Sequence, residues 1–241
     1  MHELRRLIAA GTGPRRALPL GLAALDACLP DGGLPCGALH EVVPATPGAL
    51  PAAFGFIVAL LARTPHPIVF VMPAQGRRRD GRLSGHGLNA LGLNPARAIL
   101  VETAHRKDTL WAMAEALRSG IPLAVAAMID RLELKLSQKL QLAAGDAGRP
   151  LFLVRPAQTL EASAAATRWR VGPARGARDR FGLYAQPRWH LQLERCRNGR
   201  PGEWVVEYDH VAHRFSLAAA LADPALYRGA SDRSCRAAGR S

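Results

Sequence analysis

The chain lacks the features that mark membrane-spanning and secreted proteins. Its 241 residues contain no run of about 18 apolar side chains, which excludes an ordinary transmembrane helix. The N-terminal residues carry charge at Glu3, Arg5 and Arg6 and contain no apolar segment of the signal-peptide type. We therefore expect a cytoplasmic protein with no membrane contact.

Cysteine is scarce and its spacing is irregular. Four cysteines occur, at Cys28, Cys36, Cys196 and Cys235. No two of them form a Cys-x-x-Cys pair, so neither a disulfide framework nor a cysteine-based metal site is expected. Cys28 and Cys36 are flanked by apolar residues and should be buried thiols. His210 and His213 have no further candidate ligand nearby, so we expect no metal.

Lysine is almost absent, although the chain is strongly basic. The 32 basic and 19 acidic side chains give a net charge of +13, but the basic set includes lysine only at Lys107, Lys135 and Lys139. A charge of this size favours anionic partners such as nucleic acid or an acidic protein surface. The alternative is that many of the arginines are simply solvated surface groups.

Strand and helix patterns alternate through the first two thirds of the chain. Apolar runs predict strands at 38–43, 67–72, 98–101, 123–129 and 151–154. Helical spacing predicts helices at 22–29 and 52–63, from the cap Asp108 to Gly120, and from the cap Asp130 to Ala143. The stretch 73–87 is interpreted as an exposed loop. The alternation is typical of an α/β fold in which helices cover both faces of a mostly parallel sheet.

The pattern changes in the C-terminal third. Alternating apolar residues at 189–193 and 204–208 flank Asn198-Gly199, a pair favoured in tight turns, which predicts an antiparallel hairpin extension. Phe215 and Leu217 can supply a third strand. We divide the chain into a basic N-terminal helix and linker at 1–17, a main domain at 18–220 and a flexible basic tail at 221–241.

The residues before the first strand resemble a known family. Leu18–Asp26 followed by Gly32–Val42 is similar to the start of a RecA-type ATPase core, in which a Gly-Gly-Leu-Pro-x-Gly turn leads into the first core strand. The chain resembles the ImuA family more closely. The residues that carry this resemblance also include Leu110–Gly120, Ser163–Val171 and Pro187–Trp189. The resemblance implies that 18–220 is a RecA-like core with a degenerate phosphate loop.

The ImuA resemblance implies an accessory role in error-prone translesion DNA synthesis, within the SOS response to DNA damage. The implied partners are an ImuB-like, catalytically inactive Y-family protein and a DnaE-type polymerase. RecA and DNA are further candidate contacts. Two alternatives stay open: a SulA-like inhibitor of cell division, because that family is also RecA-like and damage-inducible, and an active nucleotide-binding RecA-like ATPase.

The lysine distribution argues against nucleotide chemistry. A phosphate loop wraps the phosphates with backbone N–H groups, neutralises them with a lysine and holds magnesium with a serine or threonine hydroxyl. Alignment from Gly32–Glu41 places Leu50 at the lysine and Pro51 at the hydroxyl, and no lysine precedes Lys107. The loop also contains three prolines, which lack the N–H that such a loop supplies.

The other RecA-type catalytic positions also lack the required groups. The strand that ends near Met128 offers no carboxylate for magnesium, because Asp130 comes two residues later and suits a helix cap. Gln75 stands near the place of the water-activating glutamate, and an amide cannot act as a base. We therefore expect no catalytic residues, no cofactor and no ATP hydrolysis.

Binding is then the expected activity, and arginines are the candidate contacts to a partner or DNA. The candidates are Arg5, Arg6, Arg77, Arg78, Arg79, Arg168, Arg170, Arg195 and Arg197. In an extended strand, Arg168 and Arg170 share one face while Trp169 lies on the other. Each group has a structural alternative, which is an edge strand with solvated arginines for 168–170 and a solvated loop for 77–79.

Overall fold

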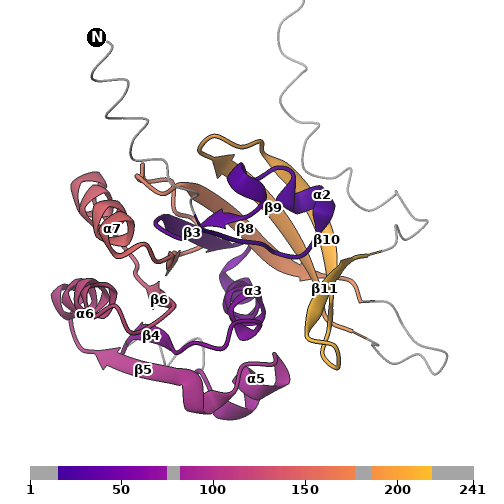
Figure 1. The fold of residues 1–241 in the computed structure, drawn as a ribbon, viewed down its shortest axis with the longest axis horizontal. Helices are drawn as coiled ribbons and strands as arrows, with labels where there is room; N and C mark the ends of the chain where they lie inside the picture. Colours follow the sequence, from indigo (N-terminus) through magenta and orange to yellow (C-terminus); the bar gives the residue numbers. More distant parts are fainter. Residues whose placement is uncertain (1–15, 75–81, 177–185, 219–241) are drawn as a thin grey trace, which may run out of the picture.

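The computed structural model describes residues 16–74, 82–176 and 186–218 (Figure 1). The expected N-terminal helix with Arg5 and Arg6, the basic loop at 77–79 and the tail at 221–241 lie outside the described residues. Within the described ranges, no helix combines the length and apolar character needed to cross a bilayer.

A nine-stranded sheet runs through the described residues in the order β11-β10-β9-β8-β3-β7-β6-β4-β5. The parallel strands are β3 (Leu39–Pro44), β4 (Ile68–Pro73), β5 (Ala98–Thr103), β6 (Ala124–Met128), β7 (Leu151–Val154) and β8 (Thr167–Ala174). Strands β9 (Arg188–Cys196), β10 (Gly202–Asp209) and β11 (Arg214–Leu217) continue the sheet in antiparallel pairing. The predicted α/β fold, with a mostly parallel core and an antiparallel extension, is confirmed.

Helices cover both faces of the parallel strands, which explains why the central strands β4, β6 and β7 are apolar throughout. Helix α3 (Leu50–Ala62) packs on one face, and its side chains join a core cluster that includes Phe70, Phe152 and Trp169. Helices α6 (Arg106–Arg118) and α7 (Leu134–Ala147) pack on the opposite face, in a separate core cluster (Figure 1). A strand between two covered faces needs apolar side chains in both directions.

The segment before β3 is held by one carboxylate rather than by a long helix. Strand β1 (Ala17–Leu18) pairs with β2 (Leu34–Pro35), and helix α2 (Ala23–Asp26) has only four residues. Asp26 accepts backbone hydrogen bonds from residues 20, 21 and 22 at 2.8, 2.9 and 3.1 Å. The prediction of a helix over 22–29 is therefore wrong in length, because Asp26 fixes this segment as a compact turn.

Two helix boundaries differ from the sequence predictions. Helix α7 begins at Leu134, with Glu133 as its N-cap, and not at Asp130. The backbone N–H of Leu132 bonds to the carboxylate of Glu161 at 3.3 Å, which holds 130–133 outside the helix. In α6 the N-cap is His105, so Asp108 lies inside the first turn rather than at the cap.

A short helix, α5 (Gly85–Ala90), begins within the stretch 73–87 that was interpreted as a loop. Ser84 caps it by accepting a hydrogen bond from the backbone N–H of Gly87 at 3.1 Å. Leu88 is buried and joins the α3 core. The high glycine content hid this helix, and the serine cap was the signal that could have found it.

The C-terminal turn is confirmed, and the expectation for the cysteines is not. Asn198 has a positive φ of 61°, which suits the expected hairpin turn between β9 and β10. Cys28 and Cys36 are only half-buried, so the prediction of fully buried thiols is wrong. Partial burial raises the pKa of the Cys36 thiol, and this effect is larger than the lowering by the positive charge of Arg16.

Candidate functional site

The loop after β3 is the segment in which the RecA resemblance implied a phosphate loop. It turns through a short 3-10 segment, Pro47–Ala49, and then enters α3 at Leu50. Pro51 lies in the first turn of the helix, where a missing N–H costs no hydrogen bond. Leu50 is only 8% exposed, so its side chain packs inward rather than toward a ligand in solvent.

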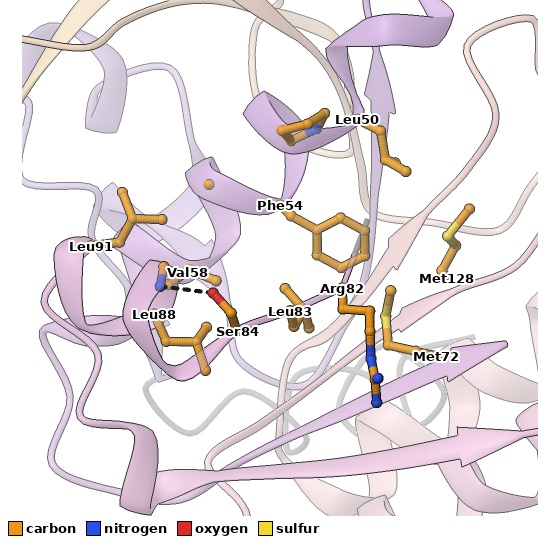
Figure 2. A pocket seen from close by; sticks show the side chains of 13 residues that line it. Leu50, Phe54, Val58, Met72, Arg82, Leu83, Ser84, Leu88, Leu91 and Met128 are labelled. Atoms are coloured by element: carbon orange, nitrogen blue, oxygen red, sulfur yellow. Dashed lines mark hydrogen bonds between the residues drawn. The ribbon is translucent and has the colours of Figure 1, made fainter. Parts of the chain in front are cut away.

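An apolar pocket lies beside this helix start (Figure 2). Its walls come from the start of α3, the carboxyl ends of β4 and β6, and the segment 82–91, and its volume is about 180 Å³. Leu50 and Phe54 lie on one side, and Met72 and Met128 project from the strand ends (Figure 2). Ligands of open α/β sheets bind at the carboxyl ends of strands. This position is lined by hydrocarbon and thioether groups.

The pocket provides little for a phosphate or a metal ion. Met128 stands at the end of β6, where the RecA resemblance implied a magnesium carboxylate. Asp130 follows two residues later and is exposed. Gln75 lies outside the described residues. Over the described part of the chain, no group of three or more His, Cys, Asp or Glu side chains could hold a metal ion. Arg82 is the charged residue among the pocket-lining side chains that the structure describes.

Arg168 and Arg170 are held by carboxylates of the same chain. Both lie on β8, opposite in face to Trp169, which is fully buried in the α3 core. A nitrogen of Arg168 lies 2.7 Å from the carboxylate of Glu41, and Arg170 pairs with Glu194. Strand β8 lies between β3 and β9, so the alternative of a solvated edge strand is wrong.

A buried ion-pair network explains why Arg168 points where it does. Glu41, in the middle of β3, and Arg155, directly after β7, are both fully buried, with 3.4 Å between Oε1 and Nη1. Arg155 also pairs with Glu161, and Arg168 donates to the backbone oxygen of Glu161 at 2.9 Å. Sequence reasoning missed this network. Its signal was a charged residue inside an apolar strand, since buried charges are normally paired.

Arg195 and Arg197 are exposed but already make contacts within the chain. Arg195 donates to the backbone oxygen of Ala165 at 3.1 Å, and Arg197 donates to that of Ala164 at 3.0 Å. They therefore fasten the segment before β8 to the end of β9. The structure brings Arg168 and Arg170 together on one face, and it gives all four described candidates a role in holding the fold.

A second buried polar chain crosses from β3 to β8. Trp169 Nε1 donates to Thr167 Oγ1 at 3.1 Å, and this hydroxyl lies 2.8 Å from His40 Nδ1. His40 Nε2 lies 3.0 Å from the backbone oxygen of Pro35 and donates to it. Burial lowers the pKa of His40 from 6.5 to about 4, so the imidazole is neutral at pH 7. These bonds align β3 and β8 and do not reach the pocket.

The fold and the site define the class of the protein. No family model matches the chain. Among solved structures, it is similar to a KaiC-like protein from the hyperthermophilic archaeon Pyrococcus horikoshii OT3, with a TM-score of 0.54 and 14% sequence identity. The match covers 86% of this chain and 100% of that chain. The chain therefore has a RecA/KaiC-like fold.

Curated relatives identify the family. The chain is 36% identical over 236 residues to Protein ImuA of Caulobacter vibrioides, in strains NA1000 / CB15N and ATCC 19089 / CIP 103742 / CB 15. Each match covers 89% of this chain and 94% of the relative. The chain belongs to the ImuA family, as its sequence resemblance implied.

Proposed function

We propose that this chain is a non-catalytic RecA-like accessory protein that supports error-prone translesion synthesis in the SOS response through protein–protein contacts. The observation that carries the proposal is the apolar character of the expected nucleotide position. Alignment from Gly32–Glu41 puts Leu50 and Pro51 at the lysine and hydroxyl positions, and Met128 ends β6, where the resemblance implied a magnesium carboxylate.

The expected nucleotide position lacks, at Leu50 and Met128, the charged groups that a triphosphate needs. A triphosphate needs a cation and backbone donors, and each such electrostatic group is worth about 3 kcal/mol in a comparable catalytic site. Placing the phosphates against Leu50 and Met128 would remove their hydration and return no ionic contact. The alternative of an active ATPase is therefore disfavoured.

The proposed partners are an ImuB-like Y-family protein and a DnaE-type polymerase, with RecA and DNA as further contacts. The net charge of +13 is compatible with an acidic protein surface or with nucleic acid. Four of the candidate arginines already hold internal contacts, which favours protein partners over a dedicated phosphate-binding surface.

Nucleotide binding is the first test. The full chain is titrated with a fluorescent ATP analogue in the presence of magnesium, and ATP hydrolysis is followed in parallel. We expect no saturable binding and no turnover above the buffer background. Hydrolysis that disappears when the loop at 44–51 is mutated would establish an ATPase and overturn the proposal.

Partner binding is the second test. The tagged chain is combined with the purified Y-family-like protein, with and without nuclease, and the retained protein is quantified. We expect retention to survive nuclease treatment. Binding to DNA alone should be weak near physiological salt, and a steep salt dependence would instead indicate phosphate contacts. Loss of the partner after nuclease treatment would mean that DNA, not protein contact, joins them.

A further inference from the structure

The pocket beside α3 has the size and lining of a site for one apolar side chain. Its volume of about 180 Å³ is close to that of a cavity of about 150 Å³ lined by Leu, Ile and Phe that binds benzene. Phe54, Leu88 and Met72 are nearly buried within it, so the walls are fixed by the core rather than by mobile surface groups. A leucine or phenylalanine side chain would fit.

The charged residue at the mouth of the pocket indicates which charge a bound segment should carry. Arg82 lines the pocket, and its side chain is 68% exposed (Figure 2). It pairs with Glu102 of β5 at 3.6 Å. No acidic side chain is found among the pocket-lining residues that the structure describes. The chain as a whole carries a net charge of +13. Because the Arg82 side chain stays largely exposed despite its pair with Glu102 and the chain is strongly basic, an acidic segment complements this rim better than a basic one.

The neighbouring part of the chain cannot supply the occupant. Residues 75–81, which precede Arg82, contain glycine, glutamine, arginine and aspartate and no large apolar side chain. The described N-terminus begins at Arg16, whose backbone bonds to Cys36 before β3, at the amino end of the strand. The pocket lies at the carboxyl ends of the strands, the other end from Arg16.

We propose that this pocket seats a leucine or phenylalanine side chain presented by an acidic segment of the Y-family-like partner. The proposal rests on the proposed adaptor function, because it assigns the position of the lost nucleotide site to partner recognition. One apolar side chain seated in a preformed pocket is the kind of contact that dominates an interface, while the arginine at the rim contributes to orientation and association rate.

The test compares two pocket variants with two matched controls. Leu83→Trp enlarges a half-buried side chain in the pocket wall, and Arg82→Glu reverses the charge at the mouth. The controls are Leu142→Trp, at an exposed leucine on α7, and Arg118→Glu, at an arginine that is also 68% exposed and also paired with a glutamate. Both controls lie on helices of the opposite sheet face.

Affinity of each full-length variant for the purified partner is the main readout. We expect Leu83→Trp to weaken binding about tenfold or more and Arg82→Glu by about threefold, with the controls close to wild type. Unchanged affinity in both pocket variants would overturn the docking proposal while leaving the adaptor function in place. Absence of partner binding by the wild-type chain would overturn the adaptor function itself.

A second readout is independent of the partner. Fluorobenzene is titrated against the wild-type chain and Leu83→Trp, and binding is followed by its fluorine NMR signal. We expect saturable binding to wild type that Leu83→Trp abolishes and that Leu142→Trp leaves intact. Equal binding to wild type and Leu83→Trp, or binding to neither, would show that the pocket does not accept an apolar group.

Discussion

Two regions of the sheet differ in the side chains that they present. The carboxyl ends of the parallel strands are mainly apolar, and the outer face of the antiparallel strands carries ion pairs. The first region, beside α3, presents Leu50, Met72 and Met128. The second carries ionic pairs, such as Arg188 with Glu207 and His190 with Glu203. Among its described lining residues the first region carries charge at Arg82, whereas the second places opposite charges on neighbouring strands. A high arginine content in this chain therefore reflects internal pairing as well as any partner surface.

The largest effect should come from removing a buried aromatic group that packs between α3 and β10. Trp169 is fully buried, contacts Phe56 and donates to Thr167. We expect Trp169→Ala to lower the free energy of unfolding by about 4 kcal/mol, measured by urea denaturation. Trp111→Ala, at a tryptophan that is 67% exposed, should cost less than about 0.5 kcal/mol. Equal losses would contradict the assigned core.

The charge comparison is sharpened by breaking one ionic pair of each kind. Glu41→Gln leaves Arg155 buried without its full counter-charge and should cost about 3 kcal/mol in unfolding free energy. Glu194→Gln removes the partially exposed partner of Arg170 and should cost about 0.5 kcal/mol. Urea unfolding of both variants measures the two losses of unfolding free energy. A larger loss for Glu194→Gln would show that the buried Glu41 network contributes less to stability than the partly exposed pair.

The polar chain between β3 and β8 predicts a dependence on pH. The pKa of His40 is about 4 in the folded chain and 6.5 when unfolded, so the unfolded state binds the proton first as the pH falls. Stability due to neutral His40 is present above pH 6.5 and is lost toward pH 4, by up to about 3 kcal/mol.

Unfolding by urea at several pH values checks this dependence. His40→Gln can keep a donor toward Pro35 and an acceptor toward Thr167, so it serves as the control. The variant should lose less stability than wild type over the same pH interval. Parallel pH profiles for the two proteins would show that another group causes the loss.

The smallest expected effect concerns ATP hydrolysis by a repaired loop. Leu50→Lys with Pro51→Thr restores two groups of the phosphate loop, but Met128 still ends β6. We expect no measurable hydrolysis, because the magnesium carboxylate is still missing. Because Leu50 is nearly buried, unfolding of the variant is measured alongside. Robust turnover would show that the strand ends are still competent for catalysis.

The regular elements were predictable because their signals are local. Strand β7 has the bounds 151–154 that the apolar run gave, and Asn198 marks the turn of the hairpin. Helix α5 was missed because two of its six residues are glycine. The start of α7 was misplaced because the backbone of Leu132 bonds to Glu161, a contact 29 residues away that no local pattern reveals.

The candidate site was predictable only in part. The residue types at Leu50 and Pro51 predict a degenerate phosphate loop, and the structure places both residues in the first turn of α3, two residues before the predicted helix start at 52. The roles of Arg168 and Arg170 were not predictable, because their partners Glu41 and Glu194 come from neighbouring strands. The paired residues are far apart in the sequence, and only the order and register of the strands bring them together.

The sequence by itself determined which chemical groups this chain can bring to a ligand, because no fold can create a lysine at Leu50 or a hydroxyl at Pro51. It also determined the order of strands and helices through their periodicity. The tertiary structure decided which charges are paired and where an enclosed apolar surface forms. Both depend on contacts between segments such as α3 and 82–91, which packing alone brings together.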